Sequence, residues 1–177
     1  MRKSRTQEEL AVAILPIRVY PDPALKEKTH VVDSIDDDLR KLIKNMIDTM
    51  RAAPGIGLAA NQIGVLKRVV VVEVDDEVMA LINPEITWYS EEQEENEEGC
   101  LSVYPDKISV NVSRSLRIIV KATNEHGEDV EFEAEGLFAR AIQHELDHIN
   151  GKVIIDRTSA EERRTALREL TEQMGMG

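Results

Sequence analysis

The sequence has little cysteine, no long apolar run and no excess of positive charge. A single cysteine, Cys100, occurs in 177 residues. An intramolecular disulfide is therefore excluded, and the thiol is a buried apolar group, a reactive group or a metal ligand. No stretch of 18 apolar residues is present, and the first 17 residues lack the apolar centre and cleavage site of a signal peptide. We therefore expect a cytoplasmic protein with no membrane contact.

The charge balance limits the kinds of partner. The formal net charge of −12 would repel a polyanion, which argues against direct nucleic-acid binding through phosphate neutralisation. A hydrophobic fraction of 42% with 32% charged residues fits a globular protein but does not separate an enzyme from a binding module. The length suits one domain over residues 1–177.

Hydrophobic periodicity predicts three helices. Apolar residues recur at spacings of three and four over residues 36–53, where Ser34 and Asp37 are candidate caps. Further helices are predicted over residues 136–150 and over 160–174. Residues 1–10 show no period, so we expect a flexible leader there.

Strand patterns fill the region between the first two helices. Residues 67–74 are nearly continuous in valine and predict a hairpin with residues 78–83. Three later runs alternate apolar with polar residues, as half-buried antiparallel strands do, over 108–112, 116–120 and 130–134. The acidic stretch 91–98 is interpreted as a solvated loop or a sheet edge rather than as a binding surface. This order favours an α+β single domain, with antiparallel sheets packed around the helix over 136–150.

That helix carries two histidines four positions apart, His144 and His148. Side chains at this spacing lie on one helix face about 5–6 Å apart, so both can reach one metal ion. Glu145 lies beside them and could take a proton from a metal-bound water without occupying a coordination position. The alternative is a solvated helix that happens to contain two histidines. The spacing favours a metal-binding helix but leaves the reaction open.

Cys100 is the candidate for a third ligand. A catalytic metal site typically has three protein ligands and one water. A lone cysteine is usually a buried small apolar residue, but this one follows Gly99, which permits a close approach of the backbone. A thiolate ligand favours iron or zinc over magnesium or calcium.

Residues 55–62, with the sequence GIGLAANQ, combine glycines with an amide side chain. They could simply end the first helix and form a turn. In a hydrolase, the glycines would expose backbone groups to a bound peptide, and Gln62 could donate an N–H to an oxygen that gains charge in the transition state. This segment alone does not decide between the two interpretations.

Three segments together resemble the signature motifs of peptide deformylases in order and spacing: 55–62 (GIGLAANQ), 98–102 (EGCLS) and 143–148 (QHELDH). The resemblance extends over about residues 14–157. It implies a metal-dependent hydrolase that removes the N-formyl group from the N-terminal formylmethionine of newly synthesised proteins and releases formate.

The resemblance also implies a role for each motif residue. Cys100, His144 and His148 would hold the metal, and Glu145 would move the proton. Gln62 and the backbone N–H of Leu101 would stabilise the oxyanion. The ion would be Fe2+, with Zn2+, Ni2+ or Co2+ possible in a purified sample. The positions that match substrate-binding residues of the family are Ile56, Gly57, Glu98, Leu137, Arg140 and Ala141.

Two features depart from the family pattern. Arg140 brings a charge to a methionine pocket, where it either turns to solvent or shifts the side-chain preference. Tyr104 and Lys107 alter the segment after Ser102 and bear on how residues after methionine are handled. The expected partners are N-formylmethionyl nascent peptides and, transiently, the ribosome.

Two other functions are compatible with part of these motifs. A zinc peptidase of the two-histidine helix class would cleave internal peptide bonds and would be indifferent to the loss of Cys100. A non-enzymatic metal-binding domain would need a fourth protein ligand, and neither His30 nor His126 lies in a segment that suggests one.

Overall fold

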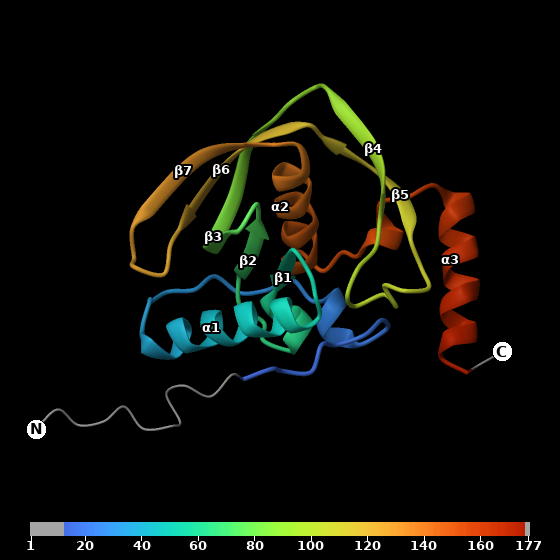
Figure 1. Ribbon diagram of the computed structural model, residues 1–177, viewed down its shortest axis with the longest axis horizontal. Helices are drawn as coiled ribbons and strands as arrows, with labels where there is room; N and C mark the ends of the chain where they lie inside the picture. The colour runs from blue at the N-terminus through green and yellow to red at the C-terminus, as the bar shows by residue number, and fades with distance from the viewer. Residues whose placement is uncertain (1–12, 176–177) are drawn as a thin grey trace, which may run out of the picture.

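The structure is a computed structural model that describes residues 13–175, within which seven strands and three α-helices are found (Figure 1). Five strands form an antiparallel sheet in the order β1-β2-β3-β6-β7, and β4 and β5 form a separate hairpin. The expected leader at residues 1–10 lies outside the described residues. The elements are α1 (Asp37–Ala52), β1 (Gly57–Ala59), β2 (Val69–Val74), β3 (Glu77–Tyr89), β4 (Gln93–Glu98), β5 (Val110–Ser115), β6 (Arg117–Thr123), β7 (Asp129–Glu135), α2 (Gly136–Ile149) and α3 (Ala160–Gln173).

The valine run of β2 is buried on both faces of the main sheet. Val69 and Val71 belong to the apolar cluster that includes α1, whereas Val70 and Val72 belong to the cluster that includes α2. Successive side chains of a strand point to opposite faces, so a strand between two helices needs an unbroken apolar run. The predicted hairpin of β2 with β3 is confirmed.

The helix α1 packs its apolar stripe on the main sheet, with Leu39 and Ile43 almost fully buried. Its cap differs from the predicted one. Asp36 is the N-cap residue, because its Oδ1 accepts a hydrogen bond from the Leu39 N–H at 2.9 Å. Ser34 precedes this position, and Asp37 is already the first residue of the helix.

The strand β3 is longer than the sequence pattern predicts. The pattern predicts an end at Asn83, but the strand continues to Tyr89. Asn83 adopts a φ of 51°, and its side chain exchanges two hydrogen bonds with the backbone of Val32, at 2.8 and 2.9 Å. The pairing with β6 shifts register at this point. This local irregularity accommodates Pro84 inside the strand.

Two strands lack a clear sequence signal. β1 has only three residues and lies inside the segment interpreted as a groove or a turn. β4 consists of polar residues that are all exposed except the last, so no apolar alternation marks it. Its pairing with β5 defines it as a strand. Of the two interpretations of stretch 91–98, loop or sheet edge, the second is therefore the correct one for residues 93–98.

The helix α2 stands in the middle of the molecule, with the main-sheet strands β3, β6 and β7 to its left and β4, β5 and α3 to its right (Figure 1). Its apolar residues, including Ile142 and Ile149, pack on the main sheet. The predicted α+β class, with antiparallel sheets around this helix, is confirmed. Between residues 13 and 175 no helix is both long and apolar enough to cross a membrane.

Candidate active site

A cavity of about 350 Å³ opens between α2, the segment that leads into β1 and the turn that follows β4. Three stretches that are far apart in the sequence, within 54–62, 97–105 and 137–145, supply its walls. The predicted site residues that line it are Ile56, Gly57, Gln62, Glu98, Cys100, Leu101, Leu137, Arg140, Ala141, His144 and Glu145. His148 is 1% exposed and contacts two of these lining residues. The fold therefore brings the predicted residues together.

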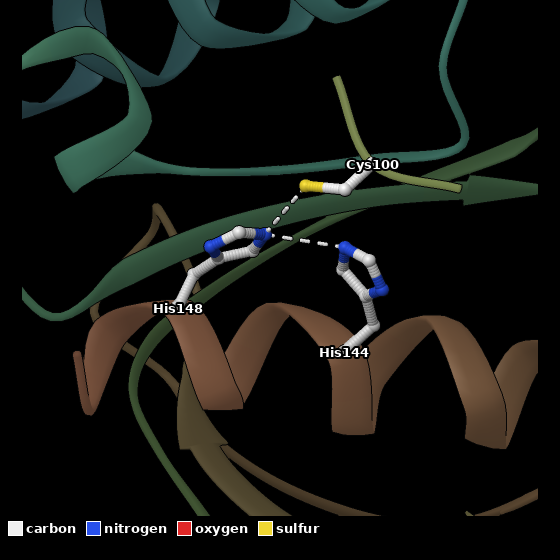
Figure 2. A group of neighbouring side chains, drawn as sticks. All are labelled: Cys100, His144 and His148. Carbon is white, nitrogen blue, oxygen red and sulfur yellow. Dashed lines mark hydrogen bonds between the residues drawn. The ribbon is translucent and has the colours of Figure 1, made fainter. Parts of the chain in front are cut away.

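The thiol of Cys100 and the imidazoles of His144 and His148 point toward one another (Figure 2). The Sγ atom lies 3.3 Å from His148 Nε2, which in turn lies 3.2 Å from His144 Nε2. One candidate ligand atom from each residue lies within 4.8 Å of the other two. The histidines come from consecutive turns of α2, and the cysteine comes from the turn after β4.

This donor set fits a transition-metal ion. A thiolate with two imidazoles suits iron or zinc and is a poor site for magnesium or calcium. Burial disfavours a charged imidazole, but hydrogen bonds to Cys100 and Glu98 outweigh it and raise the pKa of His144 well above its usual range. Burial, with the neighbouring His144, lowers the pKa of His148 well below its usual range.

Glu98 holds His144 in place. Its Oε1 lies 2.9 Å from His144 Nδ1, and Arg114 donates to both carboxylate oxygens at 2.9 and 3.0 Å. Burial opposes ionisation, but the hydrogen bonds from His144 and Arg114 keep the pKa of Glu98 well below its usual range. A carboxylate in this position fixes the ring orientation and tautomer of a metal-binding histidine. Glu98 lines the cavity, but its charge is directed at the histidine.

A second carboxylate continues this polar network. Arg114 donates to Asp147 at 2.7 Å, and Asp147 also accepts hydrogen bonds from Arg157 at 2.8 and 3.1 Å. Asp147 is only 8% exposed, so its ion pair with the buried Arg114 lies inside the protein. Arg157, from the segment after α2, thus connects through Asp147 on α2 and Arg114 on β5 to Glu98. Glu98 is the carboxylate that binds His144.

Gln62 is held with its amide N–H beside the thiol. Its Oε1 accepts a hydrogen bond from the Ala59 N–H at 2.9 Å. Its Nε2 donates to Ser102 Oγ at 3.1 Å and lies 3.9 Å from Cys100 Sγ. Because the oxygen is engaged by the backbone, the donor group is the end that faces the site. This is the orientation that an oxyanion donor requires.

Glu145 is buried beside the cluster and against Gly57. Its Oε1 lies 3.9 Å from His144 Nε2, and its Oε2 has no hydrogen-bond partner within the described range 13–175. Burial raises the pKa of Glu145 to about 7. A Cβ at position 57 would lie 2.7 Å from Oε1, so the close approach requires Gly57. A Cβ on Gly99 would meet nothing closer than 3.7 Å, so close approach does not explain that glycine.

Apolar side chains stand at the mouth of the cavity. Ile56 and Leu137 are 45% and 57% exposed, and Ala141 is buried. The guanidinium of Arg140 does not turn to solvent, because it donates to Glu98 and to two backbone carbonyls. The solvent interpretation of this arginine is therefore wrong, whereas its effect on side-chain preference stays a prediction.

Comparison with known proteins decides the family. The family model described as polypeptide deformylase matches residues 14–164. The chain belongs to the polypeptide deformylase family. The peptide deformylase of Natranaerobius thermophilus is 53% identical over 147 residues, which cover 82% of this chain and 93% of that protein. The peptide deformylase of Thermodesulfovibrio yellowstonii is 49% identical over 153 residues, which cover 84% and 91%.

Solved deformylase structures share the fold. A peptide deformylase from Legionella pneumophila superposes with a TM-score of 0.86 and 39% identity, covering 93% of this chain and 97% of that one. The peptide deformylase from Thermotoga maritima superposes with a TM-score of 0.80 and 47% identity, covering 82% and 98%.

Deformylase membership gives the reaction. The chain is a metal-dependent hydrolase that removes the N-formyl group from the N-terminal formylmethionine of newly synthesised proteins. The resemblance seen in the three sequence motifs is thereby confirmed, and deformylation, rather than peptidase activity or a closed structural metal site, is the function.

Two further polar residues support this deformylase site, although the sequence gives no direct signal for their roles. Ser102 accepts the hydrogen bond that positions Gln62. Asn61 donates a hydrogen bond to the backbone carbonyl of His148 at 2.5 Å. It therefore connects the segment 55–62 to α2. Both residues lie inside the signature motifs, and this position is the only indication in the sequence that they belong to the site. The hydrogen bond that Glu98 accepts from His144 has no sequence signal either, because no local pattern joins residues so far apart.

Proposed function

We propose that this deformylase binds Fe2+ through Cys100, His144 and His148 and uses Glu145 as its proton carrier. The observation that carries the proposal is the convergence of one thiol and two imidazole Nε2 atoms beside a cavity that two of the three residues line. Zn2+, Ni2+ or Co2+ can occupy the same donors in purified protein. When bound, the ion supplies Lewis acidity that activates water and polarises the formyl carbonyl.

Glu145 moves the proton in this proposal. Its carboxylate is buried within 3.9 Å of the ligand histidine and is not part of the three-ligand cluster. It accepts a proton from the attacking water and delivers it to the methionine nitrogen as the bond from carbon to nitrogen breaks. The products are formate and a free amino terminus, so that no other reactant is needed.

Gln62 and Leu101 stabilise the developing negative charge. The Nε2 of Gln62 faces the thiol end of the cavity, and Leu101 follows Cys100 directly. Donors held in place before the reaction stabilise an oxyanion without a reorganisation cost. Ser102 supports this role because it holds the Gln62 amide in orientation.

The substrate lies in the cavity with its methionine among apolar side chains. Ile56, Leu137 and Ala141 provide apolar contact for the thioether, and Gly57 offers backbone groups to the peptide. Glu98 and Arg140 complete the lining, with their charged groups bonded to each other. Tyr104 adopts a φ of 42° and directly precedes Pro105, which lines the cavity. We therefore expect Tyr104 to affect how the protein binds the substrate residues after methionine.

We further propose that residues 1–177 form one catalytic domain that works in the cytoplasm on nascent peptides. The net charge of −12 would repel ribosomal RNA at a distance, so we expect any encounter with the ribosome to be transient and not to depend on direct nucleic-acid binding.

The test is metal exchange with a formate readout. The protein is stripped with a chelator, reloaded anaerobically with Fe2+, Zn2+, Ni2+ or Co2+, and assayed for formate release from formyl-Met-Ala-Ser. We expect activity to return with metal and to be highest with Fe2+. Absence of formate release with every ion would overturn the proposal, and faster turnover with Zn2+ than with Fe2+ would overturn the choice of iron. Unformylated Met-Ala-Ser is the control, because internal cleavage of it would indicate a peptidase.

A further inference from the structure

The ligands of the proposed metal site come from two different packing units. Cys100 belongs to an apolar cluster with Leu25 and with residues of β5, α3 and the segment after α2. The α2 residues that flank the ligand histidines, such as Ile142 and Ile149, belong to the cluster under the main sheet. No strand of the main sheet pairs with the hairpin among the described strands. The distance from the thiol to the imidazoles therefore depends on how the hairpin is held against α2.

Polar side chains of α2 bind the hairpin at several positions. Gln143 on α2 exchanges two hydrogen bonds with the backbone of Ser115, at 2.9 and 3.2 Å, at the end of β5. Asp147 on α2 pairs with Arg114 on β5. Neither of these contacts reaches the backbone of β4, the strand that leads directly to Cys100.

Arg140 makes that connection. Its side chain is 11% exposed, and its guanidinium donates to Glu94 O on β4 at 2.6 Å and to Val112 O on β5 at 3.0 Å. It also donates to the carboxylate of Glu98, the last residue of β4. One α2 side chain therefore binds the backbone of both hairpin strands and the carboxylate that orients His144.

We propose that Arg140 is a positioning residue that sets the spacing between Cys100 and the two ligand histidines. A planar guanidinium has donors in fixed directions, so it can bind three acceptors at once and hold their relative positions. Without it, β4 keeps its pairing with β5 but loses its backbone attachment to α2. The thiol is then presented over a wider range of positions, and the metal is bound more weakly.

This role differs from a contact with substrate. A residue that only lines the methionine pocket alters KM or side-chain preference and leaves metal affinity unchanged. A residue that only stabilises the fold lowers the unfolding temperature of the metal-free protein without a specific change in the thiolate–metal bond. The inference rests on the proposed three-ligand site, and the metal-binding measurement separates it from both alternatives.

The experiment measures Co2+ binding to metal-free protein under anaerobic conditions and in the absence of peptide. Co2+ reports on the thiolate through a sulfur-to-metal absorption band, and its dissociation constant is obtained by competition with a chromophoric chelator. Arg140→Met keeps an apolar side chain of similar length but has no donor. Arg140→Lys keeps the charge but cannot reach all three acceptors. The matched control is Arg40→Met, because Arg40 also binds one carboxylate and one backbone carbonyl, on a remote face.

We expect Arg140→Met to raise the Co2+ dissociation constant about 10- to 100-fold, the range found when groups that support metal ligands are removed. The sulfur-to-metal band should shift or weaken, while Arg40→Met matches the wild type. If Arg140→Met does not fold, Arg140→Lys carries the test, with an expected rise of about fivefold.

Three results would overturn the inference. One is an affinity within about twofold of wild type for Arg140→Met, or for Arg140→Lys where the first variant does not fold. Another is an equal loss in Arg40→Met, which would indicate general destabilisation. The third is a wild-type protein that does not bind Co2+, which would remove the proposed metal site as well. The first two results leave the proposed function intact.

Discussion

Replacing Glu98 by glutamine tests the polar network that surrounds the ligand histidine. Glu98 accepts hydrogen bonds from Arg114 and Arg140 and binds His144. Glutamine keeps the size of the side chain but removes its charge, so two guanidinium groups then face a neutral amide. We therefore expect Glu98→Gln to destabilise the metal-free protein, before any effect on metal binding is considered.

The magnitude follows from burial and from the remaining partner. The side chains of Glu98 and Arg114 are 6% and 5% exposed. Loss of one member of a buried ion pair costs about 3–5 kcal/mol. Because Asp147 still pairs with Arg114 at 2.7 Å, we take the lower value of about 3 kcal/mol. At about 2–4 °C per kcal/mol for a chain of this size, the unfolding midpoint should fall by about 6–12 °C.

The assay is thermal unfolding of metal-free protein, followed by circular dichroism at one scan rate. Glu73→Gln is the control, because Glu73 forms an exposed two-bond pair with Arg51, and exposed pairs contribute little to stability. We expect that control to stay within about 2 °C of wild type. A Glu98→Gln midpoint equally close to wild type would refute the assignment of Glu98 as a charge that the network needs.

Three further substitutions probe the proposed roles. Cys100→Ala should abolish binding of the metal, measured by elemental analysis after dialysis, because two histidines alone leave the site short of a ligand. Gln62→Ala should lower kcat/KM by about 100- to 1000-fold with metal content unchanged, since it removes one oxyanion donor. Gly57→Ala should lower kcat by about 100-fold, because the new Cβ would lie 2.7 Å from Glu145 Oε1 and displace the proton carrier. Formate release gives both kinetic readouts.

Each of these substitutions has a clear contrary outcome. Full metal content in Cys100→Ala would remove the thiol from the site. Metal loss in Gln62→Ala would mean that this residue supports the cluster rather than the transition state. For Gly57→Ala the control is Gly99→Ala, whose Cβ would meet nothing closer than 3.7 Å. Equal losses in both glycine variants would show that the contact with Glu145 is not the cause.

Local sequence rules predicted the groups at the centre of the site. His144 and His148 meet because residues four apart share a helix face, and this depends on α2 alone. Cys100 followed from the need for a third ligand, and the three motifs together identified the family that the comparisons confirm. What the sequence did not reveal is the support for these groups. The hydrogen bonds of Glu98 and Arg140 join α2 to the hairpin, and no periodic pattern records such long-range contacts.

The fold, too, was predicted where the sequence has a strong periodic pattern and was missed elsewhere. The valine run of β2 and the stripe of α1 are strong periodic signals, and both elements were predicted. The predicted end of β3 at Asn83 was wrong. Asn83 and Pro84 resemble the end of a strand, but two hydrogen bonds between Asn83 and Val32 stabilise an irregularity within it. β1 and β4 were not predicted as defined strands, because β1 is very short and the exposed residues of β4 show no apolar alternation.

The edge position of β1 has a consequence for how widely the protein can act. Among the described strands, β1 pairs only with β2, and Gly57 lines the cavity at its start. A free strand edge offers main-chain groups that every polypeptide can match, whatever its side chains. We therefore expect recognition of the substrate beyond its first residue to depend on main-chain groups rather than on side chains. This suits an enzyme that must act on many different proteins.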